Sequence, residues 1–117
     1  QGHRCSWNEM QAWIVSQDVP IFRNGLTLMQ FTNNLALSGI CEKPTIAEMS
    51  SWISKNRKLG AYYGLLILGF NLQHGTQEWI QSAFTALYSH LDQHLSAVDK
   101  ATLRFDVIFV EHILCKI

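Results

Sequence analysis

The segment from Leu59 to Leu72 constrains this chain most, because a helix formed by it is apolar on almost every side. Such a helix is stable only when other elements surround it. The segment is shorter than the roughly 20 residues that a helix needs to cross a bilayer, so we expect no membrane span. A buried strand is the alternative, but the length and the Ala, Leu and Tyr content favour a helix. We therefore predict a central helix over about residues 59–73.

Signals that start helices recur along the rest of the chain. Ser6 with Glu9 and Thr45 with Glu48 have the spacing of capping boxes, and Ser96 is a further candidate cap. Apolar residues follow these positions at helical spacing. We expect helices over about 6–17, from Pro20 to Gly39, from 45 to 58, from 76 to 95 and over about 97–116. The predicted fold class is all-α, a compact array or bundle of five to six helices around the central one.

Two local alternatives accompany this prediction. The run from Phe105 to Val110 is rich in β-branched and aromatic residues, which makes an edge strand the competitor of a helix there. Gly60 and Gly64, with Gly69 nearby, either let two helix backbones approach closely or line a cavity for an apolar ligand. We favour the helix in the first case and close packing in the second.

Length and charge limit the classes of protein to which the chain can belong. At 117 residues it has room for one domain. Nine Lys and Arg balance nine Asp and Glu, whereas a general nucleic-acid or anionic-membrane binder needs a positive surplus. The opening Gln1–His3 resembles the remnant of a tag-removal site, so we expect residues 4–117 to be a single helical domain cut from a larger protein.

The three cysteines, Cys5, Cys41 and Cys115, cannot all pair within the chain. Small secreted domains usually carry an even disulfide set, so the odd number favours an intracellular setting of unknown compartment.

His90 and His94 are the best candidates for a metal site, because residues four apart project from one helix face. His112 and Cys115 are the residues that would complete a set of four ligands. However, no glutamate follows the first histidine as in metalloproteases, and no Cys-x-x-Cys is present. We therefore expect no metal and no cofactor.

Catalysis also lacks a signature. Nearly half of the acidic residues fall in predicted first turns, where they favour the positive end of the helix dipole: Glu9, Glu48, Glu78 and Asp99. The chain has no nucleophile-elbow pattern and no phosphate-binding glycine loop. We predict that it is not an enzyme.

Lys55, Arg57 and Lys58 form the main basic cluster. Positive charge is favourable at the end of a helix, so a solvated helix terminus is the simpler interpretation. The alternative is a patch for phosphate groups, but three charges without interleaved aromatic residues add little affinity for nucleic acid.

Four tryptophans are more than one core of this size requires, and tryptophan is enriched where a protein meets a partner. We predict a non-catalytic helical domain for protein–protein interaction or oligomerisation, as in a scaffold. Its partner is another protein or a second copy of the chain, without direct strong nucleic-acid binding and without a membrane. The predicted contact residues are Trp7, Trp13, Leu28, Phe31 and Trp52. The alternatives are a nucleic-acid-associated module using the basic cluster, or a small protein that binds an apolar ligand or a metal.

Overall fold

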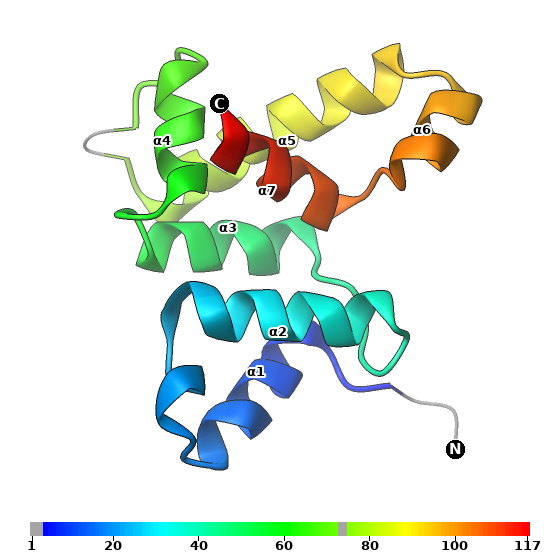
Figure 1. Cartoon of the computed structure of the whole chain (residues 1–117). Helices are drawn as coiled ribbons and strands as arrows, with labels where there is room; N and C mark the ends of the chain where they lie inside the picture. Colours follow the sequence, from blue (N-terminus) through cyan, green and yellow to red (C-terminus); the bar gives the residue numbers. More distant parts are fainter. Residues whose placement is uncertain (1–3, 73–74) are drawn as a thin grey trace. The chain divides into compact units, whose positions relative to one another are not determined.

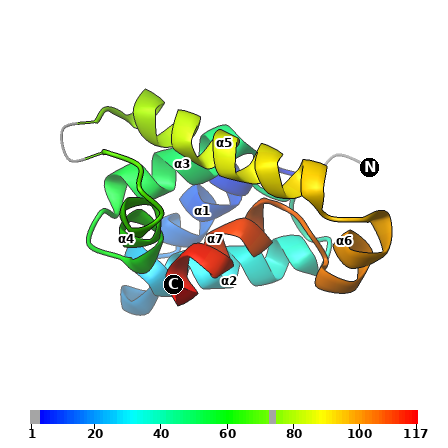
Figure 2. The same cartoon turned by 90° about the horizontal axis from the view of Figure 1, so that it is seen from above.

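The computed structural model describes residues 4–72 and 75–117, and this part of the chain contains α-helices, one 3-10 helix and no strand (Figures 1 and 2). The prediction of an all-α protein is confirmed. The tag remnant predicted at Gln1–His3 and the end of the segment 59–73 lie outside the described residues. The elements are α1 (Trp7–Ser16), η1 (Pro20–Phe22), α2 (Gly25–Leu37), α3 (Ile46–Lys55), α4 (Gly60–Ile67), α5 (Gln77–His94), α6 (Ala97–Leu103) and α7 (Val107–Lys116).

Contacts between residues divide the chain into two compact units, residues 1–48 and residues 49–117. The division falls inside α3, so this helix begins in unit 1 and ends in unit 2.

Two capping boxes organise the helix starts of unit 1, as the sequence predicts. At α1, Glu9 N–H donates to Ser6 Oγ over 3.0 Å and Ser6 N–H donates to Glu9 Oε1 over 2.8 Å. At α3, Thr45 and Glu48 exchange the same pair of bonds, at 3.0 and 3.1 Å. The second oxygen of Glu48 accepts the Asn8 N–H at 3.0 Å. One carboxylate therefore joins the N-termini of α1 and α3 and satisfies donors at both.

The core of unit 1 lies between α1 and α2. Trp7 and Ile14, seven residues apart, are both buried on one side of α1, and Leu28 and Met29 are buried on α2. The Trp7 Nε1–H donates to Asn33 Oδ1 over 3.0 Å. A buried indole N–H needs such a partner, so this bond fixes Trp7 in the core.

The helix predicted from Pro20 to Gly39 is two elements. Pro20 begins the short η1, and α2 starts only at Gly25, after Asn24 has taken an extended conformation. The end of α2 follows the prediction: Gly39 has a φ of 83°, its N–H donates to Ala36 O, and Ile40 N–H donates to Leu35 O. This is the Schellman motif. Ile40 itself is exposed.

In unit 2 the apolar segment forms a shorter helix than predicted. α4 ends at Ile67, where Gly69, with a φ of 103°, stops the helix and Phe70 N–H donates to Leu65 O. Tyr63, Ile67 and Leu68 are exposed. The prediction of a central helix surrounded by the others is thus not confirmed. No helix among the described residues combines the length and apolar character needed to cross a membrane.

α4 packs on α7, and both views show the two helices side by side (Figures 1 and 2). A Cβ at Gly64 would overlap the backbone of Leu114, whose Cα would lie 2.9 Å away, and a Cβ at Gly60 would lie 3.2 Å from Cys115 Cα. Close backbone packing is therefore confirmed for these two glycines. Gly69 has no atom close enough to restrict a side chain, and its role is to end α4.

The long helix predicted over 97–116 is broken at residues 104–106. Arg104 takes the left-handed conformation with a φ of 54°, and Asp106 caps α7 by accepting the Phe109 N–H at 2.8 Å. Phe105 fills the corner, with its ring centroid 4.9 Å from Tyr88 and 6.1 Å from Phe109. Residues 107–110 are helical, so the alternative of an edge strand is wrong.

Replacing Gly64 with alanine tests the contact between α4 and α7. The new methyl group would overlap the Leu114 backbone, so we expect Gly64→Ala to lower the free energy of unfolding by about 1–3 kcal/mol, the usual range for overpacking. Urea titration followed by circular dichroism measures the change. Gly60→Ala is the matched control and should cost less, because its Cβ has more room. Equal stability of Gly64→Ala and the parent would contradict the close contact.

Replacing Arg104 with glycine should raise the free energy of unfolding, whereas Gly64→Ala should lower it. A left-handed conformation costs a residue with a side chain roughly 1 kcal/mol, and glycine adopts it without this cost. We expect Arg104→Gly to raise the free energy of unfolding by about 0.5 kcal/mol, after allowance for the greater freedom of the unfolded chain. Arg104→Ala is the control, because it removes the side chain and keeps the strain, and it should give no gain. A gain of equal size in both variants would assign the effect to the side chain instead.

Candidate functional site

The predicted partner-binding residues have different environments. Trp7, Leu28 and Trp52 are buried, and Phe31 is half-buried with its ring stacked on Phe22 at 4.7 Å between centroids. Side chains held in a core are not available to a partner without a rearrangement. Trp13 is 60% exposed and is the one predicted contact that is available as the chain stands.

Other exposed apolar side chains lie close to Trp13 along the chain. Together with Trp13 they form a set of five from the last turns of α1, from η1 with the residue before it, and from the first turn of α2: Trp13, Val15, Val19, Ile21 and Leu26. We call these five residues the apolar surface of unit 1. The charged residues of this segment, Asp18 and Arg23, bind each other at 3.2 Å and cancel in charge. Five large apolar side chains of this segment are therefore exposed, and its two charged side chains carry no net charge.

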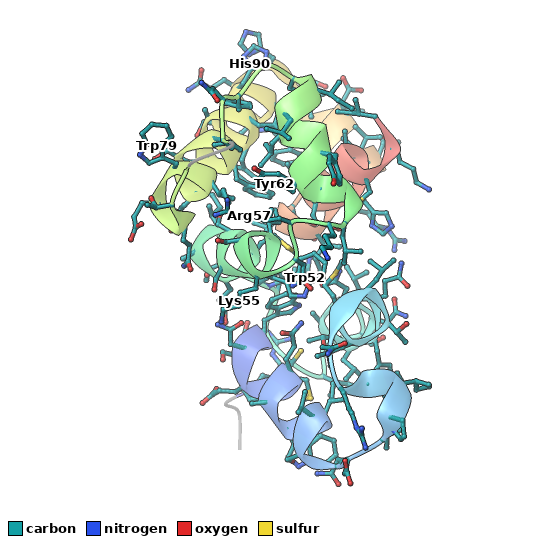
Figure 3. The ribbon with its side chains drawn as sticks, turned by 90° about the vertical axis from the view of Figure 1, so that its left-hand side faces the viewer. Trp52, Lys55, Arg57, Tyr62, Trp79 and His90 are labelled. Carbon is teal, nitrogen blue, oxygen red and sulfur yellow. The ribbon has the colours of Figure 1, made fainter. Side chains whose placement is uncertain are left out.

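The three residues of the basic cluster have different environments. Arg57 donates to the carbonyl oxygen of Gly75 at 2.8 Å and to that of Ser54 at 3.2 Å, and its guanidinium lies 5.4 Å from the centre of the Tyr62 ring (Figure 3). Lys55 and Lys58 are exposed. Arg57 thus holds the chain before α5 in place and is not a free charge, which leaves two lysines for any phosphate contact.

His90 and His94 stack on one another at the C-terminal end of α5, with ring centroids 4.2 Å apart. His94 Nδ1 donates to the backbone oxygen of His90 at 2.8 Å, so one nitrogen of this ring is already used. Of the other two candidate ligands, His112 is exposed and the Cys115 thiol binds Glu111. Within residues 4–72 and 75–117, no three His, Cys, Asp or Glu side chains are grouped as a metal site requires.

Glu111 is a buried acid on α7. Its side chain on α7 is only 2% exposed, and it accepts the Cys115 Sγ–H at 3.1 Å. Burial raises the pKa of the Glu111 carboxyl, against the weaker effects of this hydrogen bond and of His112. Burial, followed by the bond to Glu111, raises the pKa of the Cys115 thiol to about 12. Cys115 is therefore a poor nucleophile at neutral pH.

Unit 2 also contains a cavity of about 370 Å³ beside Trp79, which we call the Trp79 cavity. One wall is the chain after α4 and the other is the first part of α5, and its lining is Phe70, Asn71, Leu72, Trp79, Ser82 and Ala83. Trp79 stands out from α5 and is 59% exposed (Figure 3). A more polar hollow follows α5 from Glu78 to Ser89 and shares Ser82 with the Trp79 cavity. Trp79 is not among the contact residues that the sequence predicts, and this cavity was missed.

The comparisons with known proteins add no candidate function. The chain matches no protein-family model, and no curated protein or solved structure is significantly similar to it.

Glu111 predicts how stability depends on pH. Because its pKa is raised in the folded state, the folded chain binds more protons than the unfolded chain between the two pKa values, and stability falls as the pH rises through the folded pKa. Each unit of the shift corresponds to about 1.4 kcal/mol. We expect Glu111→Gln, which stays uncharged, to be more stable than the parent at pH 8, with a smaller difference at pH 4. Thermal melts at both pH values measure this.

Glu9→Gln serves as a control, because Glu9 is an exposed capping residue in unit 1. It should lose stability at pH 8, where the parent carboxylate accepts a charged cap bond. If Glu111→Gln behaves like Glu9→Gln, burial of the Glu111 charge does not limit stability.

Proposed function

We propose that this chain is a non-catalytic protein-binding module that uses the apolar surface of unit 1, with Trp13 as its main contact. One observation supports this most: five large apolar side chains are exposed between residues 13 and 26, and the only charged pair among them is neutralised internally. Clustered exposed apolar side chains are characteristic of interaction sites, whereas single ones are ordinary.

The arrangement of Trp13 suits a binding contact. Its position on α1, next to the buried Ile14, places it on a helix whose other side is held in a core. Little ordering is then needed on binding, and tryptophan buries a large area with few rotatable bonds. The partner that fits is an apolar helix or segment of another protein, or the same surface on a second copy of the chain.

The alternative of a nucleic-acid-associated module has less support. Arg57 is engaged by backbone carbonyls, and Lys55 and Lys58 remain as the exposed charges of that cluster. Two lysines on a chain without net charge provide a small electrostatic attraction for phosphates.

The double variant Trp13→Ala/Ile21→Ala tests the proposal. Both side chains are exposed, so the free energy of unfolding should change by about 0.5 kcal/mol or less, while removal of a central tryptophan contact should weaken binding by about tenfold or more. Sedimentation velocity at rising concentration measures self-association. Where the parent is monomeric, affinity capture from extracts of its source compares the proteins retained by parent and variant.

Val98→Ala is the matched control, because Val98 is 73% exposed and lies on α6, outside the apolar surface of unit 1. We expect Val98→Ala to self-associate or capture partners like the parent, and only the double variant to lose this binding. A monomeric parent that captures the same proteins as the double variant would refute it.

A further inference from the structure

The Trp79 cavity has walls that the rest of unit 2 fixes in position. The Tyr62 hydroxyl donates to Leu72 O at 3.0 Å, and Arg57 donates to Gly75 O at 2.8 Å. The guanidinium of Arg57 lies over the Tyr62 ring, so these two anchors support each other (Figure 3). Two side chains that do not line the cavity, those of Tyr62 and Arg57, therefore fix the chain at Leu72 and Gly75.

Gly75 explains why the Trp79 ring lies close to this wall. A Cβ at residue 75 would lie 3.1 Å from Trp79 Cβ and 3.4 Å from Trp79 Cε3. A side chain at residue 75 would require the Trp79 side chain to shift by a few tenths of an ångström. The indole consequently has one edge supported by the chain, while more than half of its surface stays exposed. An exposed aromatic face beside a cavity is a stacking surface for a planar group.

The polar groups of the lining indicate the class of ligand. The Leu72 carbonyl is already used, because it accepts from Tyr62 and from the Gly75 N–H at 2.9 Å. Asn71 and Ser82 bring an amide and a hydroxyl, and neither forms a side-chain hydrogen bond within the described residues. Together they offer both donors and acceptors. Lining of this kind, mostly apolar with a few polar groups, is typical of small-molecule sites, and the volume lies in their usual range.

The charge of the cavity lining restricts the class of ligand further. None of the six lining residues among the described part of the chain is charged, and Glu78 borders the adjoining hollow, where it disfavours an anion. A cation would gain no counter-charge from these six lining residues, and only Glu78 in the adjoining hollow could offer it one. We propose that the Trp79 cavity binds a small, uncharged aromatic molecule that carries an amide or hydroxyl group. This site is in unit 2, and the inference does not rest on the proposed function of unit 1.

Benzamide is a suitable probe, with benzoate and benzylamine as its charged counterparts. Titration into ¹⁵N-labelled protein follows the four indole N–H signals, of which that of Trp79 is identified from its absence in Trp79→Phe. We expect benzamide to shift the Trp79 signal in a saturable way and to leave the Trp13 signal in place. The charged counterparts should bind about tenfold more weakly or worse, because the lining offers them no partner.

Three variants make the test specific. Trp79→Ala removes the stacking face, and Ser82→Leu fills the cavity from an exposed position of α5; each should weaken benzamide binding by about tenfold or more. Trp13→Ala is the matched control, because Trp13 and Trp79 are 60% and 59% exposed and only Trp79 lines the cavity. The affinity of Trp13→Ala for benzamide should equal that of the parent. Unchanged melting temperatures establish that the variants fold.

Several results would overturn the inference. These are the absence of a saturable shift at Trp79, equal shifts at Trp13 and Trp79, equal affinity for benzoate, or unchanged affinity in folded Ser82→Leu. Much tighter binding of N-acetylphenylalaninamide than of benzamide would also overturn it, because the site would then take the side chain of a peptide and not a free small molecule.

Discussion

The close approach of α4 to α7 is the constraint on which most of unit 2 depends. Gly64 has no side chain, so the backbone of α4 reaches the backbone of α7 at Leu114. With the two helices at this distance, Leu65 and Leu114 are buried and the side chain of Glu111 is enclosed. A buried carboxyl with one thiol partner is expensive to ionise, which is the reason for its raised pKa. The absence of a side chain at Gly64 thus allows both the close packing of α4 on α7 and the burial of Glu111.

The four tryptophans show how far local sequence predicts environment. Trp7 and Trp13 lie on the same helix, yet one donates to Asn33 in the core and the other is exposed. Spacing carries a usable signal here, since Trp7 and Ile14 are seven residues apart and share a face, whereas Trp13 does not. Trp79 and Ile80 are adjacent and so point in different directions, and Ile80 is the buried one. Which side faces a core depends on where the neighbouring helix lies.

For the charged residues, too, the sequence predicts local contacts and not distant ones. Glu9, Glu48 and Asp99 were assigned to helix starts from sequence, and the first two form their capping boxes as predicted because capping involves atoms only three residues apart. Arg57 was assigned to a solvated basic cluster, but its main partner is Gly75, eighteen residues away. Nothing in the local pattern indicates this contact, because it exists only once the chain after α4 has turned back toward α3.

The sequence by itself determined the helical class, most helix starts and the glycine stop after α2, because these depend on hydrogen bonds between near neighbours and on the 3.6-residue period. It did not determine the break at Arg104, the length of α4 or the cavity beside Trp79. The tertiary structure decided those, together with the exposure of Trp13 and the burial of Glu111. Burial and cavity shape arise from contacts between segments far apart in the chain, and these contacts are set only when the helices pack.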